Sequence, residues 1–188
     1  VYNILDFGAK ADSTILSTNA IQAAIDKAHT NGGGIVEVPP GTYLTGTVFL
    51  KSNIKLDLQP GSRLLGSPDL KDYPEMMAGH NKDRQPYHFI MAYQAENVII
   101  TGGGTLDGNG PAFWEPTDKK IGWIKSKERR VSPMIEIKQC KNVRISDILI
   151  TRSPGWTLHL YDSDNLKITG IEIRNNIWSP NSDGIDIT

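Results

Sequence analysis

An internal repeat constrains this chain more strongly than any other feature of its sequence. Residues 134–150 (MIEIKQCKNVRISDILI) align with residues 157–173 (TLHLYDSDNLKITGIEI) at a shift of 23. Apolar residues coincide at Ile135/Leu158, Ile137/Leu160, Val143/Leu166, Ile145/Ile168, Ile148/Ile171 and Ile150/Ile173. A related copy lies at 90–102, and Leu158 matches Ile185 in a later copy at a shift of 27. Apolar residues at alternate positions within such a period predict a solenoid of short strands.

The kind of solenoid follows from what the repeat contains and what it lacks. A leucine-rich repeat could share this period, but its L-x-x-L-x-L signature and its repeated helices are missing. A parallel β-helix fits better, because each coil buries alternate residues and the coils stack at about 4.8 Å. Asparagine also recurs just before a strand of each copy, at positions 53, 97, 142 and 165. We therefore predict an all-β parallel β-helix.

One amphipathic helix precedes the strands. Small apolar residues recur at helical spacing over 19–28, with Thr18 or Asn19 as the expected amino-terminal cap and Gly32 as the expected end. We expect residues 1–34 to cap the open end of the first coil and residues 35–188 to form the coils. The period breaks at 67–88 and at 107–133, where we expect long loops, the second with a basic cluster at 125–130.

The repeat places three polar side chains in one column. Glu136, His159 and Asp186 each lie between two apolar residues of an aligned strand, so all three are expected to point outward, roughly 5 Å apart per coil. Such a column could line a substrate groove. It could equally be part of the solvated outer surface that every β-helix has.

Composition narrows the possible partners. The net charge is −1, which argues against a nucleic-acid binder held by a basic field. The single cysteine, Cys140, excludes an internal disulfide, and the histidines at 29, 80, 88 and 159 lack metal-ligand spacing. No run approaches the ~20 apolar residues of a membrane span. We expect no metal, no cofactor, no nucleic acid and no membrane segment.

Two carboxylates mark the end of the sequence. Asp183 and Asp186 lie in residues 181–188 (NSDGIDIT), where a turn meets a strand. Strict alternation would turn Asp183 inward, so the bend before Ile185 must break the alternation for Asp183 to reach solvent. Paired carboxylates are the catalytic groups of glycoside hydrolysis, whereas Asn-Ser-Asp-Gly is also ordinary turn chemistry.

Four segments resemble glycoside hydrolase family 28, the polygalacturonases. Residues 5–13 with 31–46 are similar to the amino-terminal cap of pectin-degrading β-helices, and 97–115 (NVIITGGGTLDGNGPAFWE) resembles a glycine-rich family segment. Residues 153–159 (SPGWTLH) and 181–187 (NSDGIDI) resemble two further family motifs. The resemblance implies a right-handed parallel β-helix that hydrolyses α-1,4-galacturonosyl linkages with inversion and without a metal.

The same resemblance implies roles for individual residues. Asp183 matches the aspartate that positions or deprotonates the attacking water, and Asp186 matches a second, supporting acid. Asn181 matches a residue that shapes the bend and contacts substrate, and His159 matches a residue lining the cleft. With its neighbour in the column, Glu136, these form the predicted set: Asp183 and Asp186 as catalytic residues, with Asn181, His159 and Glu136 as substrate-binding residues.

Other family motifs would follow residue 188. These are the aspartate pair with the general acid, a Gly-His-Gly motif and an Arg-x-Lys motif that binds the substrate carboxylate. We therefore expect 1–188 to be the amino-terminal part of one catalytic domain, truncated at its carboxyl end. By itself we expect it to be inactive and to need its carboxyl-terminal half or self-association. We expect a secreted or periplasmic enzyme that acts on a pectic polysaccharide or oligogalacturonide, and the two long loops resemble those of exo-acting members. The alternatives are a tailspike-like or otherwise non-catalytic β-helix and a rhamnogalacturonan or xylogalacturonan hydrolase.

Overall fold

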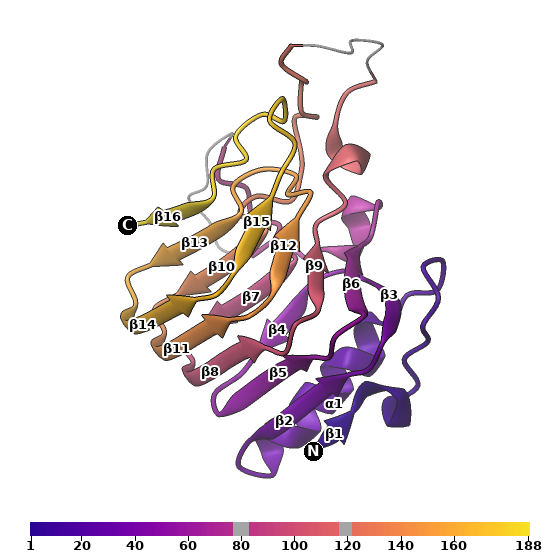
Figure 1. The fold of residues 1–188 in the computed structure, drawn as a ribbon, viewed down its shortest axis with the longest axis vertical. Helices are drawn as coiled ribbons and strands as arrows, with labels where there is room; N and C mark the ends of the chain where they lie inside the picture. Colours follow the sequence, from indigo (N-terminus) through magenta and orange to yellow (C-terminus); the bar gives the residue numbers. More distant parts are fainter. Residues whose placement is uncertain (77–82, 117–121) are drawn as a thin grey trace.

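Three parallel sheets form the body of the computed structural model, which describes residues 1–76, 83–116 and 122–188 (Figure 1). Sheet A contains, in order, β1 (Tyr2–Asn3), β2 (Gly34–Val38), β5 (Ile54–Leu58), β8 (Glu96–Thr101), β11 (Lys141–Ser146) and β14 (Asp164–Thr169). Sheet B contains β3 (Gly41–Thr45), β6 (Ser62–Gly66), β9 (Thr105–Asp107), β12 (Leu149–Thr151) and β15 (Glu172–Arg174). Sheet C contains β4 (Val48–Leu50), β7 (Ile90–Tyr93), β10 (Ile135–Lys138), β13 (Leu158–Tyr161) and β16 (Ile185–Ile187). The chain visits sheets A, B and C in turn, so the fold is a parallel β-helix, as predicted, and it has the right-handed crossovers expected of parallel strands.

The strand register confirms the sequence repeat. Ile135 pairs with Leu158 and Leu158 pairs with Ile185, at the predicted shifts of 23 and 27. Alternate residues of each strand point into the solenoid, where Leu56 and Ile100 are fully buried. Stacked coils bury these apolar residues against the coils above and below, which is why the pattern repeats.

The recurring asparagines form a ladder at the corner between sheets C and A. Asn97 donates from Nδ2 to Asn53 Oδ1 (2.8 Å), Asn142 to Asn97 (3.1 Å), and Asn165 to Asn142 (2.7 Å). All four have positive φ, between 53° and 65°. Asparagine tolerates this left-handed conformation better than most residues, so one residue type serves both the turn and the ladder.

The amino-terminal segment closes one end of the solenoid. After the 3-10 helix η1 (Ile4–Phe7), helix α1 (Thr18–Thr30) packs on β1, β2, β4 and β5 through Ile21, Ala24, Ile25 and Ala28. The predicted helix ends were slightly wrong: Ser17 is the cap residue and Asn31 follows the last turn. The cap segment also contributes β1, which extends sheet A beside β2.

The corner between sheets B and C carries the long connections. Both interruptions of the period join a strand of sheet B to one of sheet C and include the 3-10 helices η2 (Leu70–Asp72) and η3 (Gly110–Phe113). The described parts of the second interruption, 108–116 and 122–133, extend toward the top of Figure 1. Parts of the two predicted loops (77–82, with His80, and 117–121) lie outside the described residues. The shorter connection 175–184, with Asn181 and Asp183, leaves the same corner.

Candidate active site

The predicted polar column exists on sheet C. The register pairs Glu136 of β10 with His159 of β13, and His159 with Asp186 of β16. Each of the three is flanked by residues whose side chains face the solenoid interior, such as Ile135 and Leu158. Three successive coils therefore present one titratable side chain each on the outer face of this sheet.

The expected exposure of this column is wrong for two of its members. Glu136 is 1% exposed and His159 is 0% exposed. They leave the interior as predicted, but aromatic and basic side chains cover them. The His159 ring lies 5.5 Å from the ring of Trp156 and 5.8 Å from that of Tyr161. The outer face of sheet C is therefore a packed layer under the corner loops, and any contact of these two residues with a ligand requires that layer to open.

His159 links the column by hydrogen bonds. Its Nδ1 lies 2.8 Å from Glu136 Oε2, and its Nε2 lies 2.9 Å from Thr188 Oγ1. Because both ring nitrogens are engaged, the ring orientation is set on both sides. The arrangement connects a buried carboxylate to the strand that carries Asp186.

A cation from the first long connection approaches the same carboxylate. Arg84 Nη2 lies 3.8 Å from Glu136 Oε1, and the Arg84 guanidinium lies 4.7 Å above the ring of Tyr161. Glu136 is thus flanked by His159 and Arg84, as a buried carboxylate requires. Sequence reasoning missed Arg84, because the insertion that carries it has no counterpart in the repeat.

Asp183 and Asp186 lie close enough to influence one another. The Asp183 side chain is exposed, so the bend does break the strand alternation, and its backbone carbonyl accepts from Thr157 N at 3.0 Å. Partial burial and the nearby Asp183 charge raise the pKa of Asp186, and His159 opposes this shift. Asp186 Oδ2 is buried without a hydrogen-bond partner among the described residues. One carboxylate is therefore open to solvent, while partial burial disfavours ionisation of its neighbour.

Asn181 anchors the bend. Its φ is 50°, and its Nδ2 donates to Asp83 Oδ1 at 2.8 Å, which ties the 175–184 connection to the first insertion. Asn175 Nδ2 donates to Thr157 Oγ1 at 2.7 Å and to the carbonyl of Ser182 at 3.2 Å. These contacts hold the backbone just before Asp183, which gives the positional precision that catalysis needs.

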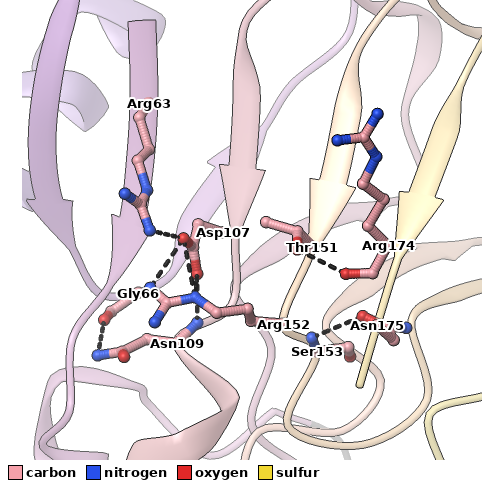
Figure 2. Close-up of polar contacts among 9 residues, drawn as sticks. All are labelled: Arg63, Gly66, Asp107, Asn109, Thr151, Arg152, Ser153, Arg174 and Asn175. Atoms are coloured by element: carbon pink, nitrogen blue, oxygen red, sulfur yellow. Dashed lines mark hydrogen bonds and ion pairs between the residues drawn. The ribbon is translucent and has the colours of Figure 1, made fainter. Parts of the chain in front are cut away.

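A buried carboxylate clamps the coils beneath the corner. Figure 2 shows Arg63 and Arg152 converging on Asp107, which is 0% exposed. Arg152 Nε lies 2.8 Å from Asp107 Oδ1, and its Nη2 lies 2.8 Å from Oδ2; Arg63 binds Oδ2 as well. Asn109 N donates to Oδ1 at 2.9 Å. The clamp joins β6, β9 and the start of 152–157, the segment that carries Trp156.

The basic cluster at 125–130 divides between solvent and interior. Arg129 pairs with Glu75 at 2.7 Å on the surface. Arg130 is 3% exposed and lies 3.9 Å from Asp83, and burial lowers its pKa. The cluster is therefore not one uniform basic surface, which its composition alone did not reveal.

Within the described part of the chain, no group of three or more His, Cys, Asp and Glu residues could hold a metal ion.

Residues 36–188 match the sequence model of glycosyl hydrolases family 28. The chain belongs to this family. A Vitis vinifera protein named "Probable polygalacturonase" is 33% identical over 98% of the chain and 39% of that protein. The exo-poly-alpha-D-galacturonosidase of Dickeya chrysanthemi is 27% identical over 99% of the chain and 38% of the relative. The chain thus spans about two fifths of the length of these family 28 relatives.

Solved exopolygalacturonase structures share the fold. The Yersinia enterocolitica family 28 exopolygalacturonase has a TM-score of 0.80 and 25% identity, over 99% of this chain and 40% of that one. The Thermotoga maritima exopolygalacturonase has a TM-score of 0.74 and 29% identity, over 92% of this chain and 46% of that one.

No helix in the described residues is long and apolar enough to cross a membrane.

Proposed function

We propose that the complete protein containing this family 28 chain hydrolyses α-1,4-galacturonosyl linkages of polygalacturonate by a single displacement with inversion. One observation carries the proposal: an exposed carboxylate, Asp183, stands beside a partly buried carboxyl with a raised pKa, Asp186. The named activities of the relatives from Dickeya chrysanthemi and Yersinia enterocolitica support the choice of substrate.

The proposed mechanism assigns different work to the two acids. In inverting hydrolysis, one carboxylate activates water and a separate acid protonates the leaving oxygen. Asp183 is the water-activating group, since its side chain is exposed and forms no hydrogen bond among the described residues. Asp186 supports it, because it stands beside Asp183 and its partial burial disfavours a second full negative charge there. The general acid and the cations that bind the substrate carboxylate are proposed to lie in the remainder of the complete protein.

The other predicted residues act around this pair. Asn181 shapes the bend through its bond to Asp83. Glu136 and His159 are proposed to act on substrate only indirectly, because other side chains cover them. Their main proposed role is to orient the strand that carries Asp186. A polypeptide limited to residues 1–188 is proposed to be inactive, because loss of proton transfer alone typically reduces a rate by about 10²–10⁴-fold.

The direct test is hydrolysis of polygalacturonate by the complete protein. Release of reducing ends is expected, and Asp183→Asn is expected to lower kcat by about 10²–10⁴-fold. Proton NMR of the first products should show the β-anomer, as inversion requires. No release from polygalacturonate, or equal activity of Asp183→Asn, would overturn the proposal. Parallel assays on rhamnogalacturonan and xylogalacturonan decide whether a sibling pectic substrate is preferred.

Exo action and an extracytoplasmic location are the finer parts of the proposal. The first insertion contacts the Asp183 connection through Asp83 and Asn181, which is compatible with a groove closed at one end. An exo enzyme releases only short products from the start of the reaction, whereas an endo enzyme first releases a range of lengths. Cell fractionation of the source organism tests the proposed secreted or periplasmic location.

A further inference from the structure

An aromatic pair, with Trp123 exposed and Trp178 half-buried, lies on the two connections that frame the candidate site. Trp123, in the second insertion, is 70% exposed. Its ring meets that of Trp178, in the 175–184 connection, edge to face with centroids 6.5 Å apart. The neighbouring Ile177 is 79% exposed. Large apolar side chains gathered in this way on a surface are typical of a binding site.

Backbone hydrogen bonds hold the pair in place. Ile124 N donates to the Trp178 carbonyl at 2.9 Å, and Glu115 N donates to the Lys125 carbonyl at 2.8 Å. Trp114 and Ser126 form an antiparallel bridge beside them. The indole of Trp123 is therefore presented by a supported segment, which reduces the entropy that binding would have to overcome.

The pair is linked in sequence to the proposed water-activating residue. Trp178 lies five positions before Asp183, so their Cα atoms are at most about 18 Å apart. The bend between them is anchored by Asn181. A sugar chain bound at Asp183 can therefore extend to the aromatic pair within a few sugar units.

One free cation accompanies the aromatic pair. Lys125 is exposed two residues after Trp123, and its Nζ has no hydrogen bond or ion pair among the described residues. The neighbouring cations are engaged: Lys127 Nζ donates to the Ala112 carbonyl at 2.7 Å, and Arg129 pairs with Glu75. An apolar surface beside an unpaired ammonium group matches a repeating sugar that has an apolar face and a carboxylate.

We propose that Trp123, Trp178 and Lys125 form an additional sugar-binding subsite at the rim, which takes a galacturonosyl residue of a polymer chain beyond the reacting unit. The indole of Trp123 packs against the C–H face of the pyranose, and Lys125 neutralises its carboxylate. The inference rests on the proposed function and extends it from the reacting unit to the length of the substrate.

A second copy of the chain is the less favoured occupant. A stable interface buries about 800 Å² per partner, and one aromatic pair with one isoleucine offers a much smaller surface. The unpaired Lys125 beside the pair would also need an acidic partner. An anionic polymer supplies both the apolar face and the negative charge in every repeat unit.

Kinetics on long and short substrates test the subsite in the complete protein. Trp123→Ala is expected to raise the KM for polygalacturonate about three- to tenfold and to leave kcat unchanged, because stacking is lost away from the reacting atoms. The KM for the shortest oligogalacturonide that the protein cleaves should not change. Trp123→Phe should restore most of the affinity. Ile15→Ala, at an exposed apolar residue before α1, is the matched control and should change neither value.

Charge is tested separately through Lys125→Gln. This variant should weaken binding of polygalacturonate at low salt and converge with the unmodified protein as salt rises. Lys125→Arg should bind normally. Binding of fully methyl-esterified polymer should be insensitive to Lys125→Gln but still weakened by Trp123→Ala, because the ester removes the charge and keeps the apolar face.

Two outcomes would overturn the subsite: an unchanged KM of Trp123→Ala for polygalacturonate, or an equal rise in KM for long and short substrates. If KM is unchanged and Trp123→Ala loses a dimer in analytical ultracentrifugation, the occupant is a second copy of the chain. Tryptophan fluorescence titrated with polygalacturonate separates this inference from the proposed function, since it requires no hydrolysis. A signal that disappears in Trp123→Ala supports the subsite even if no hydrolysis is found, in which case only the proposed function fails.

Discussion

His159 Nδ1 lies 2.8 Å from Glu136 Oε2, one coil away, and both side chains are almost completely withdrawn from solvent. A carboxylate buried in this way is tolerated because its partners are buried with it. The pair therefore joins two coils directly under the strand that carries Asp186.

Removing one partner of this pair should destabilise the protein. Among the described residues, His159→Ala leaves Glu136 with the more distant Arg84 guanidinium, and the free energy of unfolding should fall by about 3 kcal/mol. Glu136→Gln should cost about 1 kcal/mol, because the amide oxygen can still accept a hydrogen bond from Nδ1. Urea denaturation followed by circular dichroism measures both values. Equal losses for the two variants would contradict the proposed importance of the buried charge.

Asp186 should make stability depend on pH in a defined direction. Burial and the Asp183 charge raise the folded-state pKa of Asp186 above its unfolded value. The associated stability is therefore present below the unfolded pKa and is lost as pH rises through the raised folded pKa. Asp186→Asn cannot ionise, so its stability relative to the unmodified protein should increase over that rise.

A second variant tests the same pH dependence of stability. Asp183→Asn removes the neighbouring negative charge and should lower the pKa of Asp186, which moves the stability change to lower pH. Thermal unfolding measured between acid and neutral pH for the three proteins provides the comparison. A difference between Asp186→Asn and the unmodified protein that stays constant with pH would show that Asp186 has an ordinary pKa.

The Asp107 clamp should contribute more to the free energy of unfolding than an exposed ion pair of the same chemistry. Asp107→Asn weakens its bonds to Arg152 and Arg63 in a buried setting (Figure 2), and the free energy of unfolding should fall by about 2–4 kcal/mol. Asp57→Asn is the control, because Asp57 pairs with Lys55 at 3.2 Å in a half-exposed position and should cost less than about 1 kcal/mol. Denaturant titration compares them, and equal costs would contradict a structural role for the clamp.

The sequence by itself determined the solenoid and the position of the acids along it. The alternation of apolar residues can be recognised within each short segment, and the stacking of coils repeats it along the chain. The pairing of Leu158 with Ile185 could therefore be predicted by alignment alone. The break in alternation at Asp183 was also predictable, because glycine and turn residues mark it.

Only the tertiary structure decided what surrounds those acids. The burial of Glu136 and His159, the approach of Arg84 and the meeting of Trp123 with Trp178 depend on the connections at one corner. Those connections lie outside the repeat, and their contacts join residues far apart in the sequence. Periodicity predicts which side of a strand a residue occupies, whereas loop packing decides whether water reaches it.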